Sequence, residues 1–262
     1  MTDQILLRRD ADHIATLTLN APHSLNALSI SMIKALQHQI TSIAADASVR
    51  VVILRGAGRA FCAGHDLKEM QAARADADQG RGFFTRLFTD CATMMQALAA
   101  LPQPVIAQVQ GLATAGGCQL VASCDLVVAA DTARFGVNGI NIGLFCATPM
   151  VALTRKVAPA VAFEMLTTGE FISATRAREV GLVNRVTTSE MLDQDTQALA
   201  ATLAAKLAPA LQAGKAAFSA QAALPLAQAY AMTSQVMVDN MLKADTDEGI
   251  TAFLQKRPPH WS

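Results

Sequence analysis

The stretch from residue 102 to 131, PQPVIAQVQGLATAGGCQLVASCDLVVAAD, constrains the fold more than any other part of the chain. Its two apolar runs, Val105 to Val109 and Leu126 to Ala130, each predict a buried strand. Between them lie Gly111, the pair Gly116-Gly117 and a run of small residues that suits a helix. A chain that passes from strand through glycines to helix and back to strand is typical of an α/β protein.

The turn at Gly116-Gly117 has two interpretations. In the first, the glycines supply the backbone angles of a tight connection and do nothing else. In the second, the first N–H groups of the following helix point at a ligand, because they have no partner inside the helix and lie at the positive end of its dipole. Such groups can stabilise an oxygen that becomes negative during a reaction. Taken alone, the turn favours the first interpretation.

A second turn of the same kind changes this balance. Residues 59–70, RAFCAGHDLKEM, follow the apolar run Val51 to Leu54. Asp66 and Glu69 match a helix N-cap and its return partner, so we expect a helix that begins just after Asp66. The backbone N–H of His65 then lies in the turn before that helix. Two such turns can each contribute one N–H to a single oxygen, and this pattern predicts an oxyanion site.

Motifs along essentially the whole chain resemble those of the enoyl-CoA hydratase/isomerase, or crotonase, superfamily. The matching segments are residues 24–28 (SLNAL), 61–66 (FCAGHD), 111–118 (GLATAGGC), 124–126 (CDL), 134–136 (RFG), 164–169 (EMLTTG), 181–183 (GLV) and 253–258 (FLQKRP). The longer phrases GLATAGGCQLVASCD, GLFCATP and EGITAFLQKRPPHW resemble one particular branch of that superfamily.

The resemblance implies an α/β fold, a crotonase-type spiral of ββα units followed by a C-terminal helical oligomerisation segment. We place the core with the acyl-CoA site at residues 1–195 and the helical segment at 196–262. Helical patterns run from Thr188 to Lys256 and are interrupted near Pro209 and Pro225. The resemblance further implies a homotrimer, or a hexamer of paired trimers.

The resemblance also implies the ligand, an acyl-CoA thioester whose carbonyl oxygen lies between the backbone N–H groups of His65 and Gly116. It implies substrate and CoA contacts at Asn26, Ala27, Leu28, Ala63, Gly64, Asp66, Leu67, Lys68, Thr114, Phe253 and Lys256. In this interpretation Lys68 and Lys256 meet phosphates, the latter across a subunit boundary, and Phe253 shields the adenine. Solvated lysines at helix ends are an equally common alternative for each lysine taken singly.

The acid–base groups depart from the family pattern. A hydratase of this superfamily uses two glutamates around one water, and those positions hold Gln119 and Gly139 here. A third family position, used for an aspartate, falls near Ala147. Glutamine can orient a water but cannot take or give a proton near neutral pH. Cys146 is the one conceivable nucleophile in this loop, although buried cysteines are usually inert.

Two functions remain open on the sequence. The first is a lyase or isomerase of fatty acid metabolism that stabilises a thioester enolate, with a water or a substrate group moving the proton. The second is a non-catalytic acyl-CoA-binding paralogue. Coenzyme A enters as part of the substrate, and we expect no bound cofactor and no metal because no metal-ligand spacing or dinucleotide fingerprint occurs.

The composition of the chain limits the kinds of partner and the cellular compartment that we expect. The formal net charge is zero and no long basic block occurs, which argues against nucleic acid. No apolar run reaches the roughly 18 residues of a membrane-spanning helix. The five cysteines are odd in number and lack paired spacing, which favours a reducing compartment. The strand-like pattern near the N-terminus leaves no room for a targeting peptide. We therefore expect a cytoplasmic protein.

Several further elements follow from local patterns. The sequence predicts a strand at 14–20, a helix capped by Ser29, a mobile loop or frayed helix at 71–82, an amphipathic helix from Phe84 that stops before Pro102, a helix that begins at Thr148-Pro149, a helix from Pro159 to Gly169, and a helix from Ser173 to Gly181. The Phe/Met stripe of the helix before Pro102 indicates core packing.

Overall fold

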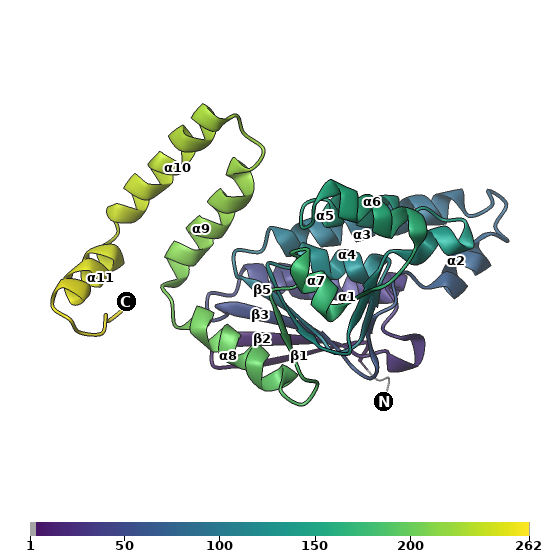
Figure 1. Ribbon diagram of the computed structural model, residues 1–262, viewed down its shortest axis with the longest axis horizontal. Helices are drawn as coiled ribbons and strands as arrows, with labels where there is room; N and C mark the ends of the chain where they lie inside the picture. Colours follow the sequence, from purple (N-terminus) through teal and green to yellow (C-terminus); the bar gives the residue numbers. More distant parts are fainter. Residues whose placement is uncertain (1–3, 262) are drawn as a thin grey trace.

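The structure, a computed structural model, describes residues 4–261. Its larger sheet has the strand order β1-β2-β3-β5-β7-β10, in which β1 and β2 are antiparallel and the other neighbours are parallel (Figure 1). These strands are β1 Leu6–Ala11, β2 Ile14–Leu19, β3 Val51–Gly56, β5 Val105–Val109, β7 Leu126–Ala130 and β10 Arg185–Thr187. The strands predicted at 14–20, 105–109 and 126–130 are confirmed, and the apolar run 51–54 forms part of β3.

A smaller sheet has the order β4-β6-β8-β9. Its strands are β4 Ala60–Cys62, β6 Leu112–Thr114, β8 Arg134–Gly136 and β9 Ile172–Ser173. Along the chain β3 leads to β4, β5 to β6 and β7 to β8, and each pair is followed by a helix. This repeat is the ββα spiral that the resemblance implied. The glycine turns therefore follow the short strands β4 and β6, rather than the long apolar runs directly.

The helices are α1 Ile30–Ala44, α2 Leu67–Ala73, α3 Arg81–Ala99, α4 Gly116–Ser123, α5 Ala147–Leu153, α6 Pro159–Thr168, α7 Ala174–Glu179, α8 Leu192–Ala204, α9 Ala208–Gln221, α10 Leu226–Met241 and α11 Ala244–Leu254. Two short 3₁₀ helices, η1 Pro22–Ser24 and η2 Asn138–Ile142, complete the elements.

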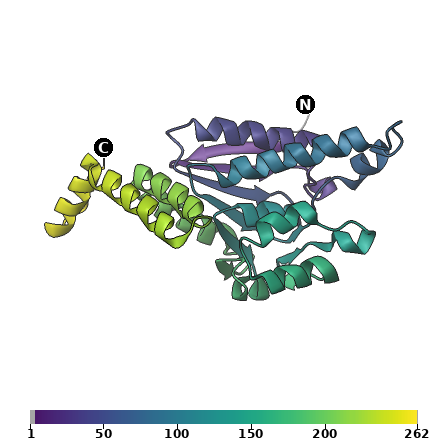
Figure 2. The ribbon, with the colours of Figure 1, turned by 90° about the horizontal axis from the view of Figure 1, so that it is seen from above.

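The larger sheet is covered on both faces (Figure 2). Val52 and Leu54 of β3 join the main core with α1, α3 and α4, whereas Val51 and Ile53 point to the opposite face and pack with α8. Successive strand residues point to opposite faces, so a strand buried on both sides reads as an unbroken apolar run. This explains why the central strands were visible in the sequence.

Several helix boundaries agree with the predictions. The Ser29 hydroxyl accepts from the N–H of Met32 at 3.2 Å and caps α1. Ser173 caps α7 in the same way, with 3.1 Å to the N–H of Arg176. Gly169, with a φ of 66°, ends α6 in the left-handed conformation that glycine favours.

Other boundaries differ. The helix expected to begin at Thr148-Pro149 begins at Ala147, with Cys146 as its N-cap. Pro149 fits inside the first turn because the N–H groups there have no partner within the helix. The predicted loop or frayed helix at 71–82 is α2 up to Ala73, then a series of turns, and then the start of α3. A break between α10 and α11 was not predicted.

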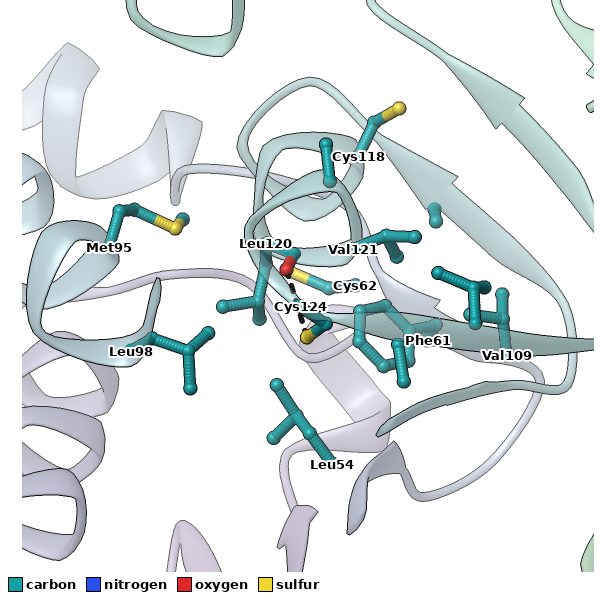
Figure 3. Close-up of a cluster of buried hydrophobic side chains, with 14 of the residues drawn as sticks. Leu54, Phe61, Cys62, Met95, Leu98, Val109, Cys118, Leu120, Val121 and Cys124 are labelled. Atoms are coloured by element: carbon teal, nitrogen blue, oxygen red, sulfur yellow. Dashed lines mark hydrogen bonds between the residues drawn. The ribbon is translucent and has the colours of Figure 1, made fainter. Parts of the chain in front are cut away.

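The core encloses the cysteines. All five, Cys62, Cys91, Cys118, Cys124 and Cys146, are buried and free. Figure 3 shows Cys62 and Cys124 among apolar side chains such as Phe61 and Leu98. Burial raises the pKa of Cys62 and of Cys124 to about 12. These thiols therefore act as small apolar side chains.

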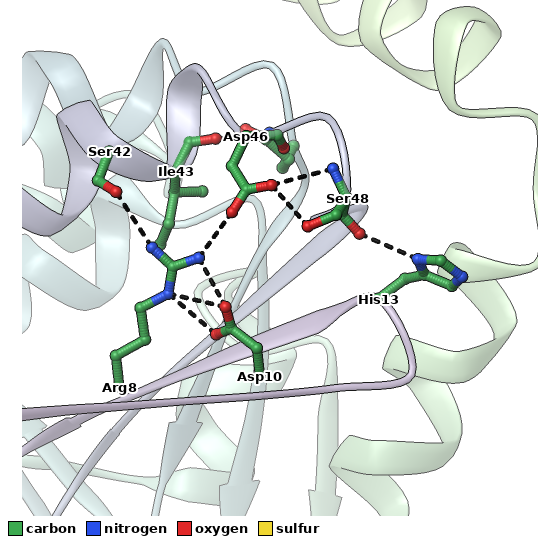
Figure 4. Close-up of polar contacts among 8 residues, drawn as sticks. Arg8, Asp10, His13, Ser42, Ile43, Asp46 and Ser48 are labelled. Carbon is green, nitrogen blue, oxygen red and sulfur yellow. Dashed lines mark hydrogen bonds and ion pairs between the residues drawn. The ribbon is translucent and has the colours of Figure 1, made fainter.

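A polar cluster fastens the β1–β2 hairpin to the end of α1 (Figure 4). The Arg8 guanidinium lies 2.6 Å from a carboxylate oxygen of Asp10 and 2.9 Å from one of Asp46. It also donates to the Ser42 hydroxyl at 3.2 Å. Hydrogen bonds from Ser48, and then from Arg8, lower the pKa of Asp46. The cluster lies on the edge strand, away from the site described below.

The segment α9–α11, here called the C-terminal arm, extends away from the sheets (Figures 1 and 2). Helix α9 has no buried residue, and α10 and α11 have one each, Ala229 and Ala252. The boundary placed at 195/196 falls inside α8, which packs on the sheet, and this division stays a prediction. No helix among residues 4–261 is long and apolar enough to cross a membrane.

Candidate functional site

Three backbone segments that are distant in sequence converge at the carboxyl ends of β4 and β6. The segment Leu25–Leu28 pairs with Ala63–His65, since the N–H of Leu28 donates to Gly64 at 2.7 Å and the N–H of Ala63 donates to Leu25 at 3.0 Å. The third segment, Thr114–Gly117, leads from β6 into α4. The fold thus brings together the two glycine turns that the sequence singled out.

The two turns are in direct contact. Gly64 has a φ of +87°, and a Cβ at this position would lie 3.1 Å from the backbone nitrogen of Gly116. A Cβ on Gly116 would lie 3.5 Å from the Cα of Gly64. A Cβ on Gly117 would collide with the carbonyl oxygen of Cys62. Glycine is needed here because one backbone approaches another this closely.

The N–H groups of His65 and Gly116 have no hydrogen-bond acceptor among residues 4–261. Gly116 is the first residue of α4, so its N–H has no partner in the helix and lies at the positive end of the dipole. Ala115, with a φ of 49°, turns the chain so that the helix can start there. This pair of N–H groups can donate hydrogen bonds to a ligand oxygen. That role stays a prediction.

The His65 side chain lies beside this pair in an apolar environment. Its ring packs edge-on against Phe88 at a centroid distance of 5.4 Å, and its Nδ1 lies 3.4 Å from the carbonyl oxygen of Leu28. Burial lowers the pKa of the imidazole, so the ring is neutral near pH 7. Its Nε2 is buried and has no partner among residues 4–261. The ring lines the site without a charge.

Asp66 and Glu69 both cap helices. Asp66 accepts from the N–H groups of Lys68 at 2.8 Å and Glu69 at 3.3 Å, and α2 begins at Leu67 as predicted. Glu69 is not the return partner of Asp66, because its carboxylate accepts from the N–H of Ile30 at 2.9 Å. Glu69 therefore caps α1, and both carboxylates are already engaged.

Gln119, on the first turn of α4, is 5% exposed. Its Oε1 is buried and has no hydrogen-bond partner among residues 4–261. A buried amide oxygen without a partner is costly, so this oxygen is available to a water or ligand. Thr114 is also buried, and its hydroxyl lies 2.6 Å from the Oδ1 of Asn138 on η2. This contact joins the turn before α4 to the following loop.

Gly139, in the loop after β8, leaves no space for a side chain. A Cβ at this position would collide with the carbonyl oxygen of Leu144 and lie 2.8 Å from the Sγ of Cys146. The reason for glycine here is steric, since its φ is not positive. Burial raises the pKa of Cys146, so its thiol is not an activated nucleophile. Ala147 adds no titratable group.

The residues that the resemblance implies for CoA binding differ in their exposure to solvent. Asn26 is fully buried, and its amide is committed to the backbone of Ala21, Ala57, Ala60 and Phe61. Ala27 and Leu28 are also buried, whereas Leu67 and Lys68 are exposed at the start of α2. The side chain of Asn26 thus holds the Leu25–Leu28 segment in place, and α2 offers the exposed groups.

Phe253 and Lys256 lie on and just after α11, at the opposite end of the molecule from α2 (Figure 1). Phe253 is 81% exposed. Within one chain the structure does not bring these residues to His65 and Gly116. Among residues 4–261 no group of three or more His, Cys, Asp or Glu side chains is arranged to hold a metal ion.

The sequence analysis missed a cavity beside the site, at the start of α3, whose lining includes Arg81, Phe88 and Thr89. The sequence predicts a mobile loop or frayed helix at 71–82 and places Phe88 in a stripe that packs on the core. A usable signal was present, because Phe84 and Phe88, like Thr85 and Thr89, are four residues apart and lie on one side of a helix.

The chain is similar to known proteins in sequence and in fold. The family model "Enoyl-CoA hydratase/isomerase" matches residues 9–262. Human enoyl-CoA hydratase domain-containing protein 3, mitochondrial, is 46% identical over 97% of this chain and 82% of its own length. The crystal structure of that human protein has a TM-score of 0.93, 44% identity and coverage of 98% and 100%. The branch resemblance in the sequence was to this protein, and it is confirmed.

A bacterial structure is similarly close. The crystal structure of enoyl-CoA hydratase from Mycobacterium smegmatis has a TM-score of 0.95 and 49% identity, and the match covers 99% of both chains. The crotonase-type fold is confirmed. The expectation of a cytoplasmic protein is wrong on this comparison, because the human, rat and Xenopus relatives are all named as mitochondrial. Cysteine usage indicates a reducing environment and does not identify one compartment.

Proposed function

Because the chain belongs to the enoyl-CoA hydratase/isomerase family, we propose that it binds acyl-CoA thioesters with the thioester carbonyl oxygen between the backbone N–H groups of His65 and Gly116. Two observations carry this proposal together. The two glycine turns are in direct contact, and neither N–H group has an acceptor among residues 4–261. Two donors at one point suit an oxygen that gains negative charge as an enolate forms.

The local electrostatics support this role. Gly116 contributes the N-terminal end of α4, where the dipole favours negative charge, and the surroundings are largely apolar. Each such donor is typically worth about 3–4 kcal/mol of transition-state stabilisation. The neutral His65 ring neither supplies nor removes a charge at this point. The N–H pair therefore provides enolate stabilisation independent of any side chain.

The residues at the two acid–base positions of this site are not suited to proton transfer. The sequence resemblance places Gln119 and Gly139 at the positions of the family's two glutamates, and neither residue can exchange a proton near pH 7. Asp66 and Glu69, the two carboxylates in the segment after His65, both accept hydrogen bonds from helix N-termini. Gln119 retains a buried oxygen that can orient a water. The protein is thus an enolate-stabilising lyase or isomerase in which a water or a substrate group moves the proton.

A non-catalytic acyl-CoA-binding protein is the second candidate. It is favoured by the packing at Gly139, where the backbone of Leu144 occupies the space that an acid–base side chain needs. In that case the N–H pair serves only for binding.

Activity and binding measurements on the same protein sample distinguish these two candidate functions. Crotonyl-CoA hydration and calorimetric binding of a saturated acyl-CoA are measured on wild type, Gly116→Pro and Gly116→Ala. Proline removes the N–H, whereas alanine keeps it. The alanine Cβ comes closest to the tip of Leu28, at 3.2 Å, and its distances to the Cα of Gly64 (3.5 Å) and to the His65 ring (3.7 Å) are ordinary contacts. Binding that alanine preserves and proline abolishes supports the site. Binding without turnover of any enoyl-CoA supports the second candidate, and no binding up to millimolar ligand rejects both.

A further inference from the structure

The cavity at the start of α3 has a volume of about 500 Å³. Residues from the α2–α3 connection and the first turns of α3 form its lining: Asp78, Gln79, Arg81, Phe84, Thr85, Phe88 and Thr89. This volume lies in the range of small-molecule sites.

The cavity shares a wall with the proposed thioester site. Phe88 lines the cavity, and the same ring packs edge-on against the imidazole of His65 at 5.4 Å. The backbone N–H of His65 is one of the two proposed donors. A group that extends past the Phe88 ring from the thioester carbonyl therefore enters this cavity.

The cavity offers unused hydrogen-bond donors. The guanidinium of Arg81 and the hydroxyl of Thr89 have no acceptor among residues 4–261. The Thr85 hydroxyl donates to the carbonyl of Arg81 at 2.9 Å and keeps its lone pairs free. The carboxylate of Asp78 accepts from the N–H groups of Gly80 at 3.0 Å and Gly82 at 2.8 Å. Asp78 thus shapes the connection. These hydrogen bonds, chiefly the one from Gly82, lower the pKa of Asp78, and the charge of Arg81 also helps to lower it, although the guanidinium donates no hydrogen bond to this carboxylate.

Two aromatic rings provide the apolar part of the cavity lining. Phe84 and Phe88 are half-buried and lie one turn apart on α3. Their rings suit the methylene groups of a chain, while Arg81 and Thr89 suit an oxygen at its end. Arg81 and Thr89 are exposed and solvated, so a saturated alkyl end would displace water from these two donors without replacing its hydrogen bonds.

We propose that this cavity receives the far part of the acyl group and selects acyl chains that carry an oxygen, as a hydroxyl or a carboxylate, beyond the carbons in contact with Phe88. The inference rests on the proposed function, since it assigns a substrate class to the same site. Arg81 and Thr89 are its specificity-determining residues.

The test is calorimetric and needs no turnover. Full-length protein is titrated with three saturated acyl-CoA series of four, six and eight carbons: unsubstituted, ω-hydroxy and ω-carboxy. The variants Arg81→Met and Thr89→Val are compared with matched controls on the same helix, Arg86→Met and Thr93→Val. Arg86 and Thr93 are exposed, as Arg81 and Thr89 are, but they do not line the cavity. Circular dichroism verifies that each variant is folded.

We expect at least one oxygenated series to bind wild type about 10-fold more tightly than the unsubstituted series of equal length. Arg81→Met and Thr89→Val reduce this preference to less than about 3-fold, and the controls keep it. The response of the two oxygenated series shows which oxygen is preferred. Equal binding of all three series overturns the inference and leaves the acyl-CoA function standing, as does a preference that survives both variants. Absence of binding by every CoA ester overturns both.

Discussion

The ammonium of Lys215 lies 2.6 Å from the Oδ2 of Asp125, and this ion pair joins the first helix of the C-terminal arm to the core. Lys215 also donates to the carbonyl oxygen of Gln103 at 3.0 Å, and the Asp125 oxygen accepts from the N–H of Val105 at 2.7 Å. The Lys215 side chain is only 12% exposed, although α9 has no buried residue. One side chain therefore carries much of the attachment of α9.

Replacement of Lys215 by methionine loosens the arm. The variant leaves the Asp125 carboxylate without its partly buried partner, and a hydrogen bond to a charged group contributes about 1.5–3 kcal/mol. Hydrogen exchange measures the result, as faster exchange in α9 with the core strands unchanged. Lys243→Met, at an exposed arm position, is the control. Equal exchange in the two variants would show that other contacts hold α9.

The end of the arm is sensitive to acid. The side chain of Arg257 donates two hydrogen bonds to Glu248, at 2.6 and 2.8 Å, and lowers the pKa of this carboxyl to about 2. Because the pKa of Glu248 is lower in the folded state than its ordinary value, its ionised carboxylate stabilises the arm at pH values above about 4.5. This contribution is lost as the pH falls from about 4.5 towards 2. NMR of the Arg257 and His260 amides should show loosening in this window. Glu248→Gln should show it already at pH 7.

Much of the fold was predictable because the central strands are apolar on both faces. The strands of the smaller sheet were not, since three residues such as Ala60–Cys62 are too short to show a period. The glycine turns were visible in the sequence. The role of Glu69 was not, because its partner Ile30 is 39 residues away and only the fold brings them together. The cavity at α3 was not predicted because its lining comes from two places. One is the polar connection before α3, and the other is one face of a helix whose remaining large apolar residues pack on the core.

Gly139→Ala should destabilise the protein. The added methyl group collides with the Leu144 carbonyl oxygen and lies 2.8 Å from the Sγ of Cys146, so the loop must move. We expect a loss of about 1–3 kcal/mol, typical of overpacking, measured by chemical denaturation. Gly214→Ala is the control, because nothing lies within 4 Å and alanine favours its helix. Equal stability of Gly139→Ala and wild type would contradict the packing argument.

The C-terminal arm should be buried in an assembly. It exposes large apolar side chains, among them Phe218 (77%), Leu226 (74%) and Leu242 (80%). Exposed apolar area of this kind indicates a protein–protein contact, and we propose a homotrimer or hexamer. Sedimentation at micromolar concentration should give a multiple of the chain mass, and Phe218→Asp should shift it towards the monomer. A wild-type monomer would rule the assembly out.

Hydration of crotonyl-CoA by the wild type should be slow or undetectable. Each general acid or base typically contributes 10²–10⁴-fold, and Gln119 and Gly139 supply neither. Glutamate at 139 is excluded by the contact with Leu144, so Gln119→Glu is the informative variant. The position is 5% exposed, and burial would raise the pKa of the new carboxyl towards the working pH. Steady-state rates should increase at least 10-fold, with a pH profile that wild type lacks. An ordinary hydratase rate in wild type would mean that another carboxylate reaches the substrate, and Gln119→Glu would then leave the rate unchanged.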